Sequence, residues 1–205
     1  AMRAVLDAAA DREISYVGDG PPEQVEGAPG WRRFLDLVEE RTEVTGAGDL
    51  FARYVATAPT GALTRRDASR TSYAGLVEAG AGWSPPHPLR AALTAWDFDT
   101  GDRLVVEATA LLDRRDALLA AVRSLGVTRL TGLETTYERA PMDEVRAAFD
   151  DHERATRRVL AARNRIESAS GPLEWIGLLG DPAADHLDRA IAALQAGEVD
   201  RAEAA

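Results

Sequence analysis

Four leucines spaced seven residues apart constrain this chain more than any other feature. They are Leu104, Leu111, Leu118 and Leu125. Ala108 and Val122 occupy half-heptad positions between them, so one continuous face of a helix is apolar. Neither proline nor, after Gly101, glycine interrupts this stretch, and Gly126 supplies a C-terminal stop. Residues 99–126 are therefore predicted to form one long helix with a buried face.

A second stretch of similar length, 142–168, repeats this near-heptad spacing of apolar residues. Each stretch would form a helix about 40 Å long. Two helices with matched length and pattern can pack at the shallow angle of a helical bundle, and we expect 99–126 and 142–168 to form a long antiparallel pair within the chain. The alternative is a leucine seam between two copies of the chain.

The rest of the chain also predicts helices, because alanine is frequent, isoleucine is scarce and turn residues punctuate short apolar stretches. We expect an all-α, multi-helix bundle of helical hairpins. The predicted helices and helical segments are 2–12, 31–43, 50–57, 64–80, a stretch starting after Ser84-Pro85-Pro86, 99–126, 127–140, 142–168, 182–196 and a last one after Gly197. Residues 18–30 are predicted to be a loop, and 173–179 a short apolar segment.

Two short segments of the chain resemble each other. AALTAWDFD at 91–99 and AALQAGEVD at 192–200 align without a gap. Each predicts a helix, a tight turn and a second helix, which is the unit of helical-hairpin repeats. We expect an N-terminal helical subdomain over 1–83 and a helical-hairpin subdomain over 84–205, or one continuous domain.

Charge and composition narrow the classes of partner. The formal net charge is -10 and the pI is near 4.8, so nucleic acid and anionic membrane surfaces are disfavoured. The chain has no cysteine, which excludes disulfides and thiolate chemistry. No apolar run approaches the roughly 20 residues that span a bilayer, and we expect no membrane insertion by this segment. Ala1 before Met2 indicates a cloning remnant, and we expect a fragment of a larger bacterial protein.

No pattern in the sequence predicts a catalytic, cofactor-binding or metal site. His152 follows two aspartates and precedes Glu153, but consecutive helical residues point about 100° apart and cannot converge on one ion. His152 is expected to be a satisfied histidine in a buried stripe; His87, between prolines, is expected to be exposed, and His186 has no ligand partner at helical spacing. The chain lacks HExxH, a GxSxG elbow and the lysine of a phosphate-binding loop.

The remaining polar and aromatic residues have structural interpretations. Three acid–arginine pairs at helical spacing predict solvated helix faces: Asp150–Arg154, Glu153–Arg157 and Glu198–Arg201. The tryptophans stand at helix ends beside apolar neighbours and are expected in the core rather than in an aromatic pocket; they are Trp31, Trp83, Trp96 and Trp175.

Residues 39–55, EERTEVTGAGDLFARYV, resemble the segment that follows the catalytic domain in gluzincin-type aminopeptidases. That family has a helix, a glycine-containing turn and then Asp-Leu-x-x-Phe-x-x-Trp/Tyr. The likeness is carried by Thr45, Gly46, Asp49, Leu50, Phe51, Tyr54 and Val55. Here Phe51 follows Leu50 directly, whereas the family places two residues between them. Residues 62–200 resemble the helical C-terminal regions of large membrane-anchored actinobacterial proteins that carry such peptidase-like domains.

This resemblance implies an extracytoplasmic domain that follows a catalytic domain whose zinc site lies upstream. We expect a non-catalytic accessory or interaction domain without a cofactor, whose partner is a protein, either a neighbouring domain of the same chain or a separate molecule. The alternative is a helical domain that binds or senses a small molecule between its helices.

Overall fold

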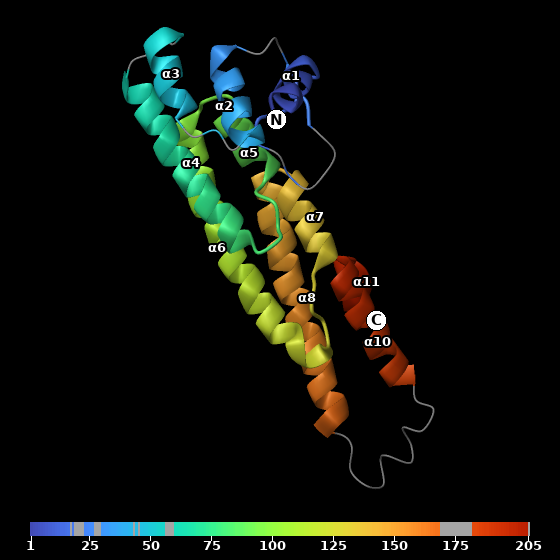
Figure 1. Cartoon of the computed structure of the whole chain (residues 1–205). Coiled ribbons are helices and arrows are strands. Elements are labelled where there is room, and N and C mark those ends of the chain that lie inside the picture. The colour runs from blue at the N-terminus through green and yellow to red at the C-terminus, as the bar shows by residue number, and fades with distance from the viewer. Residues whose placement is uncertain are drawn as a thin grey trace. The chain divides into compact units, whose positions relative to one another are not determined.

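The computed structural model is all-α, as the sequence predicts (Figure 1). It describes residues 1–16, 18, 23–26, 30–42, 44, 46–55, 60–168 and 182–204. Among these residues the β-structure is limited to an isolated bridge between Glu13 and Gln24. The helices are α1 (Met2–Ala10), α2 (Trp31–Arg41), α3 (Ala47–Tyr54), α4 (Thr60–Gly80), α5 (His87–Thr94), α6 (Phe98–Val122), the 3₁₀ turn η1 (Arg123–Leu125), α7 (Thr131–Arg139), α8 (Met142–Ser168), α10 (Pro182–Ala196) and α11 (Val199–Ala204).

The chain divides into two compact units, Ala1–Thr109 and Ala110–Ala205, and the division lies inside α6. The boundary predicted from the sequence lies between residues 83 and 84 instead. Helix α5 and the start of α6 belong with the first unit because side chains join them to earlier residues. Arg90 of α5 binds the carboxylate of Glu23, and the indole of Trp96 binds Asp36.

The two long helices form where the apolar spacing predicts them. Helix α6 ends in a 3₁₀ turn that stops at Gly126, whose φ of 77° is left-handed. Leu111 and Leu118 are buried, whereas Leu104 and Leu125 are only half-buried. The predicted range 142–168 coincides with α8.

The antiparallel orientation predicted for 99–126 and 142–168 is wrong. In the second unit, Arg114 binds Asp150 and Glu153 of α8, and ten residues further along, the carbonyl of Ser124 accepts a hydrogen bond from Arg163. Residue numbers thus rise together along the two helices, which therefore run in the same direction (Figure 1). The intervening residues 126–141 make this possible, because a short non-helical stretch and α7 carry the chain back.

The first unit contains a similar arrangement. Arg65 of α4 binds Asp99 and Asp102 of α6, and Ser69 one turn later also binds Asp102. Helix α4 and the first turns of α6 run in the same direction, with residues 81–97, which include α5, between them (Figure 1). Each unit therefore pairs long helices in parallel through a returning short helix.

The two resembling segments both form a helix, a tight turn and a helix, as predicted. At the end of α5 the amide of Trp96 donates to Leu93 and that of Asp97 donates to Ala92. At the end of α10 the amide of Gly197 donates to Leu194 and that of Glu198 donates to Ala193. These are the same paired hydrogen bonds of a Schellman cap. The likeness is local, and it does not extend to a regular repeat.

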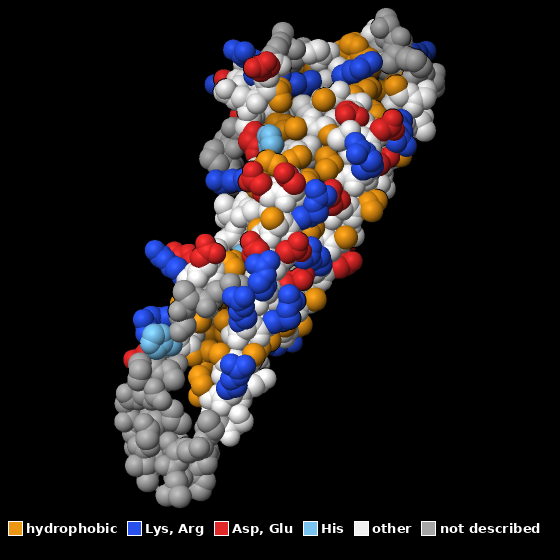
Figure 2. Space-filling view, turned by 180° about the vertical axis from the view of Figure 1, so that it is seen from behind, with side chains coloured by type: hydrophobic (Ala, Val, Ile, Leu, Met, Phe, Trp, Pro, Cys, Tyr) orange, Lys and Arg blue, Asp and Glu red, His pale blue; other side chains and the backbone are white. Residues whose placement is uncertain are grey.

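Each unit has its own apolar core. The first is built on Leu35, Leu37, Leu89 and Leu93, and the second on Leu133, Val145, Phe149 and Leu194. On the face seen in Figure 2, charged side chains of both signs alternate with apolar ones. None of the helices in the described part of the chain is both long enough and apolar enough to cross a membrane.

Some predicted features lie outside the described residues. They are most of the 18–30 loop, the 173–179 segment and Trp175. Of the other tryptophans, Trp96 is buried as expected, and Trp31 and Trp83 are half-buried.

Candidate interaction site

A buried ion pair joins α2 to α4 at the centre of the first unit. Asp36 and Arg66 are both fully buried, and Nε of Arg66 donates to Oδ1 of Asp36 at 2.6 Å. The other carboxylate oxygen, Oδ2, accepts a hydrogen bond from Nε1 of Trp96 at 2.8 Å. Each oxygen of Asp36 has a donor, which offsets part of the cost of burying its charge, although burial still raises the pKa of this carboxyl.

Trp96, whose indole binds Asp36, has a left-handed backbone with φ of 60°. That region disfavours a bulky L-residue by roughly 1–2 kcal/mol and usually holds glycine at a helix C-terminus. The indole in turn contacts Trp31 edge to face, with ring centroids 5.4 Å apart, and the Arg32 guanidinium lies 5.1 Å from its centroid. These contacts and the Asp36 hydrogen bond hold the strained residue in place.

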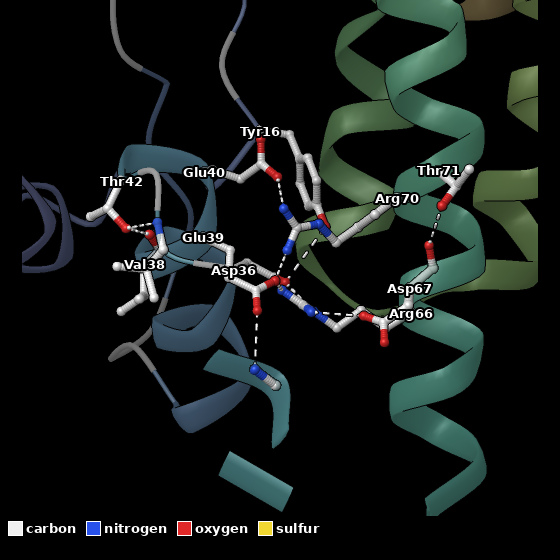
Figure 3. Close-up of polar contacts among 12 residues, drawn as sticks. Tyr16, Asp36, Val38, Glu39, Glu40, Thr42, Arg66, Asp67, Arg70 and Thr71 are labelled. Atoms are coloured by element: carbon white, nitrogen blue, oxygen red, sulfur yellow. Dashed lines mark hydrogen bonds and ion pairs between the residues drawn. The ribbon is translucent and has the colours of Figure 1, made fainter. Parts of the chain in front are cut away.

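Two further carboxylates on α2 continue this network toward the surface (Figure 3). Glu39 accepts hydrogen bonds from Arg66 and Arg70, and its Oε1 also accepts from the backbone amide of Gly48 at 3.0 Å. Glu40 accepts from Arg70 at 2.7 Å. Arg66 and Arg70 lie one helical turn apart on α4, so both side chains can bind carboxylates on the same face of α2. The network thereby joins α2, α4 and the start of α3.

An open cavity of about 710 Å³ lies over the outer end of this network. Four carboxylates line it, those of Glu39, Glu40, Asp49 and Asp67, against one guanidinium, that of Arg70. Apolar side chains lie beside these charges: Val44 is 49% exposed and Val77 is 46% exposed, and Tyr73 and Ala74 complete this wall. We call this feature the acidic groove.

Glu40 gives the acidic groove a charge that depends on pH near neutrality. Burial, together with the negative charge of Asp36, raises the pKa of Glu40 to about 7. The positive charges of Arg66 and Arg41 act in the opposite direction without cancelling this effect. The groove therefore gains negative charge as the pH rises through 7.

A second polar cluster in this unit joins Glu23 to α5. Glu23 receives two hydrogen bonds from Arg90 and lies 2.6 Å from Nδ1 of His87. Burial alone would raise the pKa of Glu23, but these hydrogen bonds outweigh it and hold the pKa below its ordinary value. His87 is partly exposed, as expected. It also binds Glu23, which is 64 residues away in the sequence.

The predicted acid–arginine pairs form in part. Glu153–Arg157 and Glu198–Arg201 are present at 3.9 and 2.6 Å. Arg154 pairs with Asp151 rather than with Asp150, because Asp150 binds Arg114 on α6. Asp36, Arg66, Glu39 and Arg70 were not singled out from the sequence. The available signal was a charge inside an apolar stripe: Asp36 lies between Leu35 and Leu37.

Several described residues of the 39–55 segment lie at this groove. Gly46 and Asp49 line the cavity, Leu50 and Tyr54 are exposed on α3, and Thr45 lies outside the described residues. Within the described part of the chain, no three histidine or acidic side chains are placed to hold a metal ion together. Comparison with known proteins finds no matching family model, curated protein or solved structure.

Proposed function

We propose that the chain is a non-catalytic helical accessory domain that binds protein, and that its acidic groove receives a basic segment of the partner. The observation that carries this proposal is the lining of the groove, where four carboxylates oppose one guanidinium beside exposed Val44 and Val77. A segment that carries arginine or lysine next to aliphatic residues complements both properties.

The carboxylates of the groove suit recognition because the network beneath positions them. Glu39 and Glu40 are held by Arg66 and Arg70, so their oxygens are ordered before a partner arrives. Ordered groups lose less conformational freedom on binding than mobile ones. The carboxylate of Asp67, which is 67% exposed, adds charge at the rim that attracts a cation over longer distances.

The setting of this domain is proposed from the resemblance of residues 39–55. A domain that follows a peptidase-like catalytic domain in a larger bacterial protein would sit outside the cytoplasm. It would bind either its catalytic neighbour or a separate protein. The segment that carries the resemblance forms one side of the groove, which favours this surface as the point of contact.

A small-molecule-binding or sensor domain is the second candidate. The specific observation in its favour is the volume of the groove, about 710 Å³, which falls within the range of ligand cavities. A thermal-shift screen separates the two candidates: a small molecule that stabilises the chain and competes with basic peptide would favour this alternative.

Fluorescence anisotropy with two labelled peptides tests the proposal. One peptide contains arginine and leucine in equal numbers, and in the other each arginine is replaced by glutamate. We expect the basic peptide to bind and the acidic one not to bind. Asp49→Asn, which removes one groove charge, should weaken binding about threefold, since one exposed ion pair contributes up to about 1 kcal/mol.

Asp113→Asn is the matched control, because Asp113 is an exposed aspartate in the second unit and its loss changes the net charge equally. It should leave the affinity unchanged. Equal weakening by both variants would mean that the peptide responds to overall charge, which would contradict a site in the groove. Affinity should also rise between pH 6 and 8, and Glu40→Gln should remove that rise.

A further inference from the structure

The second unit contains a separate cavity of about 460 Å³, lined by residues of α7 and α8 and by residues 197–201 at the start of α11. Its α8 wall consists of Ala148, Asp151 and His152. These residues lie at positions i, i+3 and i+4, so they share one face of the helix. His152 is therefore on the face of α8 that lines the cavity.

The tautomer of neutral His152 follows from its hydrogen bond. Nδ1 lies 2.8 Å from the carbonyl oxygen of Ala148, and a carbonyl oxygen can only accept. Nδ1 must therefore carry the hydrogen, and in the neutral ring Nε2 is left as an acceptor with a free lone pair. The residue is only 3% exposed, and Nε2 has no hydrogen-bond partner among the described residues. A buried acceptor without a donor is unfavourable, so the expected role of His152 as a satisfied core residue is met at one nitrogen only.

The charges around this cavity leave one carboxylate uncompensated. Asp151 is paired with Arg154 at 2.8 Å, and Glu198 is paired with Arg201 at 2.6 Å. Asp200 also lines the cavity and has no ion-pair partner in the part of the chain that the structure describes. The cavity thus offers one unpaired negative charge and one unpaired neutral acceptor.

We propose that this cavity is a binding site for a small aliphatic amine, whose ammonium group donates to Nε2 of His152 and is balanced by Asp200. An ammonium group has three donors, no acceptor and one positive charge, which matches both unsatisfied groups. A metal ion is a poorer match, because no set of three histidine or acidic ligands converges among the described residues. Nε2 is buried, so binding requires the imidazole to shift until this nitrogen reaches the cavity. This site is independent of the acidic groove.

Titration with 1,4-diaminobutane, followed by NMR of the histidine ring nitrogens, tests the proposal directly. The chain has three histidines, so the rings can be assigned by substitution. We expect the Nε2 resonance of His152 to shift on binding and its pKa to fall, while His87 and His186 stay unchanged. The neutral 1,4-butanediol should cause no shift. A shift with the diol, or equal shifts at all three rings, would overturn the proposal.

Two variants separate a specific site from attraction of a polyamine to an acidic protein. Asp200→Asn should weaken binding at least fivefold, whereas Asp188→Asn, an exposed aspartate on α10, should leave binding unchanged. His152→Phe should abolish it, and because Asp200 is exposed, Asp200→Asn remains informative if the His152 variant folds poorly. Equal effects of Asp200→Asn and Asp188→Asn, or tighter binding of Zn²⁺ than of the amine at His152, would contradict the amine site.

Discussion

The turn at Trp96 and the turn at Gly197 have the same pattern of backbone hydrogen bonds, and each has a left-handed residue at the equivalent position. The two left-handed residues have different roles. In the first unit the position carries a large indole that reaches a buried aspartate. In the second it carries no side chain, and its Cα packs against Gly132 of α7, where an added Cβ would lie 2.7 Å from the Gly132 Cα. One local geometry thus serves side-chain recognition in one place and close backbone contact in the other.

The strain at Trp96 is compensated by the contacts of its side chain. Glycine is the residue that the left-handed region favours, and Gly197 follows that rule. Trp96 breaks the rule, and its hydrogen bond to Asp36 together with its ring contacts must outweigh the backbone penalty.

Loss of the Asp36 carboxylate should have the largest effect. Asp36→Ala leaves Nε of the fully buried Arg66 and Nε1 of Trp96 without their acceptors. Breaking a buried pair in this way should lower the free energy of unfolding by about 3–5 kcal/mol. Chemical denaturation followed by tryptophan fluorescence measures it. Asp67→Ala, which removes the exposed partner of Arg66, should cost less than about 1 kcal/mol, and an equal loss in both variants would contradict the account.

Trp96→Gly makes the first turn resemble the second. It relieves a backbone penalty of roughly 1–2 kcal/mol but removes a buried indole, a loss of about 3–5 kcal/mol. We expect a net destabilisation of about 1–4 kcal/mol by thermal or chemical unfolding. Ala81→Gly tests the penalty alone, since Ala81 is exposed and has a φ of 48°. That variant should be neutral or stabilising; if Trp96→Gly were also neutral, the indole contacts would not compensate the strain.

Gly197→Ala tests the second turn. The added Cβ would both occupy a left-handed position and collide with the Gly132 backbone. Gly126→Ala is the matched control, because Gly126 has a similar φ of 77° and nothing within 4 Å of an added Cβ. The control should lose roughly 1–2 kcal/mol from the conformational penalty, and Gly197→Ala should lose about 1–3 kcal/mol more. Equal losses would show that α7 moves aside without cost.

The smallest expected effect is a pH dependence of the free energy of unfolding. It arises because the buried polar groups of the two units differ in their hydrogen bonds. Asp36 has a donor at each oxygen, whereas Nε2 of His152 has none in the described structure. Burial lowers the pKa of His152 below its ordinary value of 6.5, against the raising effects of the Ala148 carbonyl and Asp151. The unfolded state therefore binds more protons below pH 6.5, and the free energy of unfolding should fall as the pH decreases from there.

The slope due to one histidine cannot exceed about 1.4 kcal/mol per pH unit. Subtracting the stability curve of His152→Gln from that of the parent chain isolates the contribution of His152. The subtraction is necessary because the raised pKa of Glu40 produces the opposite slope between about pH 4.5 and 7. A curve for His152→Gln that is parallel to the parent curve would contradict a depressed pKa.

The sequence predicts helices well and their directions poorly. Apolar spacing and Gly126 located α6 and its end, and α8 begins and ends at the predicted residues. Heptad spacing shows only which face of a helix is buried, and it is the same whether a neighbouring helix runs up or down. The direction was decided by residues 126–141, where a non-helical stretch and α7 return the chain, and no periodic pattern encodes that return.

The candidate site was largely invisible in the sequence for a related reason. Spacing rules detect ion pairs three or four residues apart, such as Glu198–Arg201, and these are exposed. The pair that organises the first unit, Asp36–Arg66, spans thirty residues and becomes adjacent only when α2 packs near α4. Trp96 was predicted to be buried. Its left-handed backbone could not be predicted, because the usual signal for that conformation is a glycine and this position holds a tryptophan.

Mapping of amide NMR shifts on the full chain tests whether the acidic groove binds a basic protein segment. On addition of the arginine–leucine peptide, we predict shifts at Glu39, Thr42, Val44 and Tyr73 that saturate together, and none at His152 or Gly197 in the second unit. Shifts that spread over acidic residues of both units, or that centre on the second cavity, would contradict the assignment of the groove as the interaction site.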